Sequence, residues 1–387
     1  MITRLELKNF TAFTELDIDF SPKINVIIGE NGNGKTQLLK SAYALCAGGA
    51  LQQLKPGATN ELAQTLSRKL VRLLMPLDEK LGGMRRSGDR GNAQLKAAFS
   101  LGEEIALTFN GSAEVATVNA NSAYANYRAE PIFVPTKEVL SLVRGMTDAN
   151  HDQRTIELIF DDGYLDLAQM MLREGIGDLE SKVNLDPRFD KIVRMLAGLI
   201  GGRYQLENGG FCFQSGMYAE QLGKSSSETK APQTFQKDST RFVAGKSAML
   251  SSGMTAEGFR KIGVLQRLLT NGTLNPGVSG PLMWDEPESN LSPKLMRPLV
   301  EVLLELSRNG QQVILATHDY VLLKWFHLLM DKGKGDHVRF HALYRDEDSG
   351  NMQVDSVDDY RALKANAISE TFNDLTIAHA QSRLNGA

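Results

Sequence analysis

The stretch Gly29-Glu30-Asn31-Gly32-Asn33-Gly34-Lys35-Thr36 decides the fold of this chain of 387 residues. It fits the pattern G-x-x-x-x-G-K-[ST]; an apolar run over residues 24–28 precedes it, and apolar residues at helical spacing follow it. Glycines let the backbone wrap closely, so successive N–H groups and a helix N-terminus meet phosphate oxygens. We therefore expect a phosphate-binding loop (residues 29–36). In it, Lys35 neutralises the β- and γ-phosphates of ATP and the Thr36 hydroxyl binds Mg²⁺. The expected ATP contacts are Gly29, Asn31, Gly32, Asn33, Gly34, Lys35 and Thr36.

Two carboxylates end a second apolar run, Leu-Met-Trp at residues 282–284. An apolar strand that ends in acidic residues supplies the other half of such a site. We expect Asp285 to hold Mg²⁺ through Thr36 or water, and Glu286 to polarise the attacking water. Taken alone, the pair also fits a solvated acidic turn. For the chain to lack a nucleotide site, however, the acidic pair and the glycine loop would both have to occur by chance.

A third and a fourth feature flank these carboxylates. Ser251, Ser252 and Gly253 precede a helical pattern and form a signature-like turn (residues 251–254), which predicts a second anion site, although an ordinary helix cap fits equally well. His318 ends the apolar run over residues 313–317. The carboxyl ends of parallel strands share one edge of a sheet, so we expect His318 beside Glu286 in a catalytic role.

In this order, the four features resemble the ABC-type ATPase heads of the RecF, SMC and OLD families, an AAA class, over residues 2–46 and about 241–320. The opening KNFTAF resembles the family's KNF-R start, with Thr11 in place of the usual Arg. DEPESNLSP resembles its DEPE-x-x-LHP, with residues 289–291 as the D-loop. FVPTKEV resembles its Q-loop segment, with Thr136 where Gln is expected. The resemblance implies a homo-oligomer with head-to-tail ATP sandwiches, in which the signature-like turn of one subunit completes the site of another.

The expected fold class is α/β: an ABC-type P-loop ATPase head, with a mixed sheet and flanking helices, and a helical insertion or short-arm domain. We predict the N-terminal half of the head over 1–50 and a helix and β subdomain over 51–130. A helical insertion with a mobile loop (about 221–240) follows over 131–240, and the C-terminal half of the head over 241–387.

Composition excludes several classes. A formal net charge of −3 argues against a globally basic nucleic-acid binder, and two cysteines are too few for a disulfide framework or a zinc site. No apolar run approaches the roughly 18–20 residues that span a bilayer. We therefore expect a soluble, cytoplasmic protein without a membrane partner.

What the head acts on is less specified. Long coiled-coil arms are not visible, and the stretch after Tyr320 is too short for the nuclease lobe of OLD proteins. Asp346-Glu347-Asp348 fits an acidic hairpin turn better than a metal site. The chain resembles the ATPase subunits of the Septu and PARIS anti-phage defence systems (PtuA- and AriA-like), which implies slow ATP hydrolysis and a separate nuclease or toxin effector.

The alternative is a RecF-like DNA repair ATPase that binds DNA in its ATP-bound dimer, so nucleic acid is a further candidate partner. A basic cluster could line a phosphate groove, although a solvated helix and loop diluted by acidic residues fits better. The cluster consists of Arg68, Lys69, Arg72, Arg85, Arg86 and Arg90.

Overall fold

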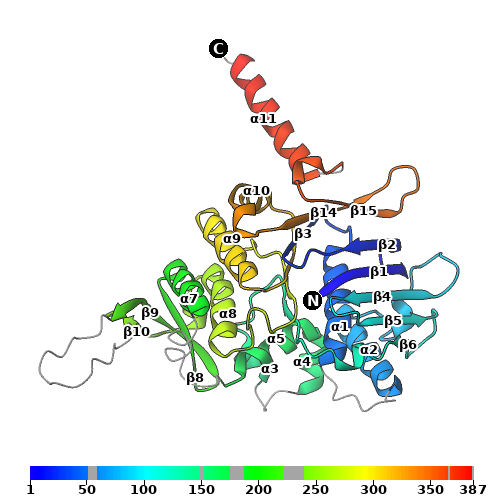
Figure 1. The fold of residues 1–387 in the computed structure, drawn as a ribbon, viewed down its shortest axis with the longest axis horizontal. Coiled ribbons are helices and arrows are strands. Elements are labelled where there is room, and N and C mark those ends of the chain that lie inside the picture. The colour runs from blue at the N-terminus through cyan, green and yellow to red at the C-terminus, as the bar shows by residue number, and fades with distance from the viewer. Residues whose placement is uncertain (51–58, 148–151, 175–186, 222–238, 365–366, 386–387) are drawn as a thin grey trace, which may run out of the picture.

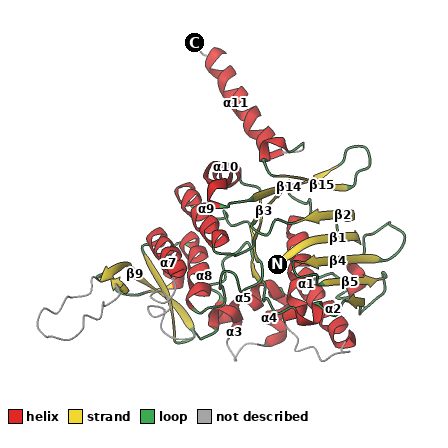
Figure 2. Ribbon diagram, in the orientation of Figure 1, coloured by secondary structure: helices red, strands yellow, loops and turns green. Residues whose placement is uncertain are grey.

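The computed structural model of the protein describes residues 1–50, 59–147, 152–174, 187–221, 239–364 and 367–385. Three β-sheets and their flanking helices make up the described chain (Figures 1 and 2). The arrangement confirms the expected α/β class with mixed sheets.

A six-stranded sheet forms the centre, in the order β15-β14-β3-β13-β12-β7. Four of its five strand pairings are parallel, and the edge strand β15 pairs antiparallel with β14. The phosphate-binding loop, the acidic strand end and His318 follow three adjacent strands, β3, β12 and β13, so parallel pairing brings them to one edge. The strands are β3 (Ile24–Gly29), β7 (Ile132–Val134), β12 (Leu282–Asp285), β13 (Val313–Thr317), β14 (Val338–Arg345) and β15 (Met352–Val357).

Side chains of the central strands alternate between two hydrophobic cores. In β3, Val26 belongs to a core that it shares with helices α5, α7, α8, α9 and α10, whereas Ile27 belongs to a core that it shares with α1 and α2. In β13, Leu315 and Ala316 divide in the same way. Both faces of the sheet are thus covered, which explains why these strands are continuous apolar runs. The helices are α1 (Lys35–Ala50), α2 (Thr59–Leu74), α5 (Asp162–Leu172), α7 (Pro187–Ile200), α8 (Glu257–Thr270), α9 (Pro293–Arg308) and α10 (Tyr320–Leu329).

An antiparallel sheet in the order β2-β1-β4-β5-β6 packs on the other side of α1 (Figure 1). Leu5 and Leu7 alternate with charged residues along β1, and both are buried in this core. A turn at Asn110 joins β5 to β6, and the backbone N–H of Ser112 donates to the Asn110 side chain at 2.9 Å. Strands from the predicted segments 1–50 and 51–130 therefore share one sheet. Its strands are β1 (Ile2–Phe10), β2 (Phe13–Asp19), β4 (Ala93–Phe99), β5 (Glu104–Phe109) and β6 (Thr117–Ala120).

The prediction of a helical insertion over 131–240 needs a correction. Its helices end at Ile200, and the chain then forms β8 and β9, which build a four-stranded sheet with β10 and β11. Asn208 and Gly209 both have positive φ angles, 49° and 74°, which is the Asn-Gly hairpin signal that the prediction overlooked. Most of the loop predicted as mobile, residues 222–238, lies outside the described residues. These elements are α3 (Val143–Thr147), α4 (Gln153–Ile159), β8 (Gly202–Glu207), β9 (Gly210–Gln221), β10 (Ser239–Ala244) and β11 (Leu250–Ser251).

The C-terminal helix α11 (Ala367–Asn385) projects away from the body of the molecule (Figure 1). Its residues 370–383 are exposed, and it is joined to α10 by the stacked rings of Tyr320 and Phe372, whose centroids lie 4.1 Å apart. Within the described residues, no helix is both long enough and apolar enough to cross a membrane.

Candidate nucleotide site

The phosphate-binding loop connects β3 to α1 and depends on glycine at two positions. A Cβ on Gly29 would lie 2.5 Å from the carbonyl oxygen of Leu343 on β14. A Cβ on Gly34, whose φ is +88°, would lie 2.7 Å from Cζ of Phe13 on β2. The loop is therefore tightly enclosed by a strand of each sheet, as the sequence pattern requires for close backbone wrapping.

Lys35 points back into its own loop. Its Nζ donates to the carbonyl oxygens of Gly29 at 2.7 Å and Glu30 at 3.0 Å, and only 7% of the residue is exposed. Burial lowers the pKa of Lys35, and the neighbouring carboxylates of Glu286 and Asp285 oppose that shift. The ammonium thus occupies carbonyl partners that it can exchange for phosphate oxygens, which are stronger, charge-assisted acceptors.

Thr36 and Asp285 meet as expected for a magnesium site. The Thr36 hydroxyl donates to Oδ2 of Asp285 at 2.8 Å, and Asp285 is 4% exposed. Burial raises the pKa of Asp285, whereas the hydrogen bonds from Thr36 and Thr136 lower it. A hydroxyl and a carboxylate at the edge of a phosphate-binding loop fit Mg²⁺, which takes one or two protein oxygens and completes its shell with phosphates and water. Mg²⁺ bound here would neutralise charge that develops on the phosphates.

Glu286 and His318 lie next to each other. Nδ1 of His318 is 3.2 Å from Oε1 of Glu286, and Glu286 adopts a positive φ of 48° directly after β12. Such a left-handed backbone is strained for a residue other than glycine, so the surrounding structure holds the carboxylate in place. The pair has the geometry of a general base with an adjacent imidazole.

Two residues that sequence reasoning missed support this pair. Oε1 of Glu288 accepts the Thr317 hydroxyl at 2.7 Å and the backbone N–H of His318 at 3.2 Å, so it anchors the turn that carries the imidazole. Lys261 on α8 is only 1% exposed, and its Nζ donates to the backbone carbonyl of Glu286 at 3.3 Å. Glu288 was visible in the acidic run, whereas nothing in the sequence around Lys261 marks it, since it is one of several polar residues in an amphipathic helix.

The signature-like turn lies apart from the phosphate-binding loop of its own chain. Residues 251–253 line an open depression of about 370 Å³ together with Arg144, Phe211 and Cys212, and no residue of the phosphate-binding loop lines it. The predicted helix N-terminus also needs a correction. Helix α8 begins at Glu257 with Ala256 as its N-cap, because residues 252–254 form a 3₁₀ turn first.

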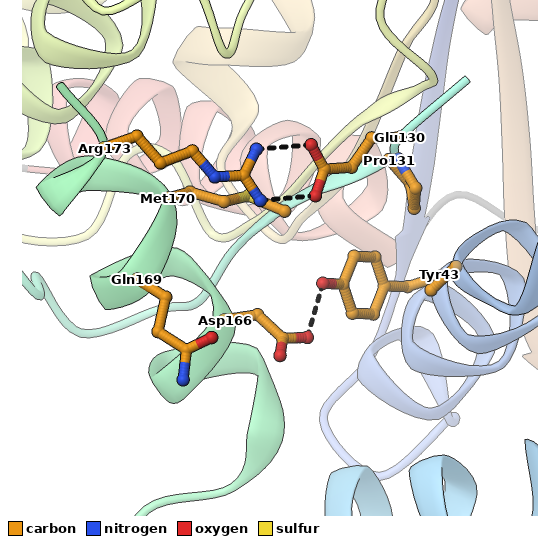
Figure 3. A pocket seen from close by; sticks show the side chains of 8 residues that line it. Tyr43, Glu130, Pro131, Asp166, Gln169, Met170 and Arg173 are labelled. Atoms are coloured by element: carbon orange, nitrogen blue, oxygen red, sulfur yellow. Dashed lines mark hydrogen bonds and ion pairs between the residues drawn. The ribbon is translucent and has the colours of Figure 1, made fainter. Parts of the chain in front are cut away.

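Buried ion pairs join α5 of the insertion to the helices behind the phosphate-binding loop. Lys69 on α2 pairs with Asp162 at 2.9 Å and Asp166 at 2.5 Å, and Tyr43 on α1 donates to Asp166 at 2.6 Å (Figure 3). Tyr43, Glu130 and Arg173 line a small cavity of about 60 Å³ (Figure 3). Arg173 forms a bidentate ion pair with the Glu130 carboxylate there. Burial raises the pKa of Asp166, and the Lys69 ammonium opposes this shift.

The acidic run at residues 346–348 forms a hairpin turn between β14 and β15. Oδ1 of Asp346 accepts the backbone N–H of Ser349 at 2.9 Å and its hydroxyl at 2.7 Å. Within the described chain, no group of three or more His, Cys, Asp or Glu residues could hold a metal ion.

Two family models match the segments that build this site. A model described as an AAA domain matches residues 4–73, and a second AAA domain model, whose description names AbiEii toxins of Type IV TA systems, matches residues 223–324. The first range contains the phosphate-binding loop. The second contains the signature-like turn, Asp285, Glu286 and His318.

Curated relatives match over short stretches. The DNA replication and repair protein RecF of Halalkalibacterium halodurans is 52% identical over 44 residues, which are 11% of this chain and 12% of that protein. RecF of Idiomarina loihiensis is 36% identical over 88 residues, which are 23% of this chain and 24% of that protein. The matched stretch thus covers a quarter or less of these relatives' length.

Among solved structures, an SMC head bound to the C-winged helix domain of ScpA resembles this chain, with a TM-score of 0.50 and 13% identity over 94% of this chain and 99% of that one. At this identity the likeness is one of fold. The chain thus has the fold of an SMC head, and AAA domain models match the segments that carry both halves of its nucleotide site.

Proposed function

We propose that the chain hydrolyses ATP with Mg²⁺ at composite sites between subunits, and that this assembly controls a separate nuclease or toxin effector in an anti-phage defence complex. In each site the phosphate-binding loop, Asp285 and Glu286 of one subunit face Ser251, Ser252 and Gly253 of another. ATP then acts as the contact between subunits, and its hydrolysis releases that contact.

The observation that carries this proposal is the openness of the signature-like turn. A Cβ built on Gly253 meets nothing within 4 Å, and the turn lines a depression without any residue of its own phosphate-binding loop. Ser251 and Gly253 are exposed in this turn, so they are accessible to phosphate oxygens presented by a second chain, whereas Ser252 is buried.

Support for the effector role comes from likeness and from one surface. One family model's description names toxins of Type IV TA systems, and the solved SMC head is bound to a domain of another protein. In this chain, α11 leaves the body of the molecule with Phe372, Leu375 and Ile377 exposed (Figure 1). Most of the stability of helices in proteins comes from packing against other elements, so a contact with another protein would stabilise α11.

Mixing two inactive variants tests the composite site. Lys35→Ala removes the phosphate-neutralising ammonium, and Gly253→Asp places a carboxylate in open space where phosphate is expected. Each variant alone has no intact site. In a mixed dimer, however, one site combines the wild-type loop of the second variant with the wild-type turn of the first. We expect an equal mixture to recover about a quarter of wild-type ATPase activity when subunits of a dimer exchange freely.

Two results contradict the composite site: an inactive mixture whose subunits are shown to exchange, or Gly253→Asp with full activity by itself. For the effector role, the test is co-purification from the native operon, where recovery of a nuclease-like or toxin-like protein that depends on this chain supports it. Robust DNA cleavage by the pure chain with Mg²⁺, lost in Asp346→Ala, would overturn the assignment of cleavage to a separate effector.

The RecF-like alternative is favoured by the matched RecF stretches, but the structure weakens the groove suggested for it. Lys69 is buried against Asp162 and Asp166, and Arg72 bonds Asp162 and two backbone carbonyls, so neither faces solvent as a phosphate contact. A salt titration of DNA binding with and without ATP separates the two proposals. A steep slope that Arg85→Glu with Arg86→Glu abolishes supports the alternative.

A further inference from the structure

Thr136 lies in the magnesium site, although the family resemblance places a glutamine there. Its hydroxyl donates to Oδ2 of Asp285 at 3.1 Å, the same oxygen that accepts the hydroxyl of Thr36 at 2.8 Å. One carboxylate oxygen of the buried Asp285 therefore accepts hydrogen bonds from two hydroxyl groups. They come from segments far apart in the sequence, residue 36 after β3 and residue 136 after β7.

The sheet places Thr136 where its short side chain can reach. Strands β7 and β12 are parallel neighbours, with Val134 opposite Trp284, so residues 135 and 136 continue beside Asp285 and Glu286. Threonine has a branched Cβ and few side-chain conformers, which keeps its hydroxyl in one place once the strand end is fixed. A glutamine at this position would hold its polar group at the end of three rotatable bonds.

We propose that Thr136 is a positioning residue for magnesium: its hydroxyl fixes the orientation of the Asp285 carboxylate that would bind the metal. This inference rests on the proposed use of Mg²⁺ at this site. Hydrogen bonds to a ligating carboxylate restrict its rotation, so less freedom is lost when the metal binds, and their removal weakens metal binding. The bond from Thr136 to Asp285 joins the end of strand β7 to the residues proposed to bind the metal.

The test measures how strongly Mg²⁺ assists nucleotide binding. The affinity for a fluorescent ATP analogue is determined in saturating Mg²⁺ and in EDTA, and the ratio of the two affinities reports the metal. Thr136→Val keeps the shape and removes the hydroxyl. We expect it to lower this ratio by about tenfold, the lower end for loss of an outer-shell partner of a metal ligand, with an unchanged affinity in EDTA.

Two further variants separate positioning from general structural damage. Thr136→Ser keeps the hydroxyl, and we expect it to restore most of the ratio. Thr3→Val is the matched control, because the Thr3 hydroxyl donates to the carbonyl of Ala98 at 3.0 Å in the antiparallel sheet, and we expect no change. Thermal unfolding of each ATP-free variant confirms that it folds.

The possible outcomes are distinct. A wild-type ratio in Thr136→Val overturns the inference, and so does an equal loss in Thr136→Ser and Thr136→Val, because the retained hydroxyl of the serine variant would then not restore the ratio. A wild-type protein whose ATP affinity ignores Mg²⁺ would instead contradict the magnesium dependence proposed for the site itself.

Discussion

Nδ1 of His318 lies 3.2 Å from Oε1 of Glu286, although 31 residues lie between them in the chain. The parallel pairing of β12 with β13, in which Asp285 lies opposite Ala316, brings these two strand ends together. The contact joins the proposed base to the proposed switch histidine, so a single strand pairing sets the geometry of both.

Glu286→Gln tests the base. The amide keeps the size of the side chain but cannot accept a proton, so we expect ATP hydrolysis to fall about a hundredfold or more while ATP binding persists. Phosphate release measures the first effect and nucleotide binding the second. Since the trapped nucleotide should hold subunits together, light scattering should show ATP-dependent association. A variant that binds ATP without any change in association contradicts the assembly mechanism.

Glu288→Gln tests the cost of a buried carboxylate beside His318. Burial raises the pKa of Glu288 above its ordinary 4.5, so above that pH the folded protein retains a proton that the unfolded chain has released. The folded state thus binds more protons in this window, and stability falls as pH rises through it. The amide still accepts the bonds from Thr317 and His318. We expect its stability advantage in urea unfolding to grow as pH rises above 4.5 and to vanish below it; a difference independent of pH argues against a buried charge.

Lys69→Met tests the ion pairs that join α2 to α5. Lys69 is 8% exposed, and its removal leaves the carboxylate of Asp166 without its ammonium partner, whereas Asp162 keeps the guanidinium of Arg72. We expect the free energy of unfolding to fall by about 3–5 kcal/mol in urea titrations. Lys80→Met is the matched control: Lys80 pairs with Glu114 at 3.2 Å on the surface, and its loss should cost less than about 1 kcal/mol. Equal losses in the two variants contradict the structural importance of the buried pair.

Gly34→Ala and Gly32→Ala separate backbone strain from crowding in the phosphate-binding loop. Both glycines have positive φ angles, +88° and +87°, so either alanine carries a strain of about 1–2 kcal/mol. Only the Gly34 variant also presses its methyl group against Phe13, at 2.7 Å. We expect Gly34→Ala to lose about 1–3 kcal/mol more in unfolding free energy. Thermal denaturation of the two proteins decides this, and a smaller loss for Gly34→Ala than for Gly32→Ala speaks against the contact.

Local patterns in the sequence predicted the phosphate-binding loop, the strands that lead into the site and the magnesium ligands, because each of these is specified by a short run of neighbouring residues. Apolar runs identified the central strands β3, β12 and β13, and the Gly-rich pattern identified the loop between β3 and α1. The helical insertion was predicted only in part. Its hairpin β8–β9 was missed although Asn208-Gly209 marks the turn, since Tyr204, Phe211 and Phe213 alternate with polar residues only over short stretches.

By itself, the sequence determined that a phosphate-binding loop, two acidic residues and a histidine would end strands of one α/β head. Only the tertiary structure decided which side chains complete that edge. Lys261 reaches the Glu286 carbonyl from helix α8, and Thr136, just after strand β7, reaches Asp285 although 149 positions separate the two residues in the chain. The tertiary structure also places Lys69 and Arg72 in ion pairs with Asp162, whereas the sequence alone allowed both residues to contact DNA. The physical reason is that motif residues are set by local backbone geometry, whereas these contacts depend on strand register and helix packing between distant segments.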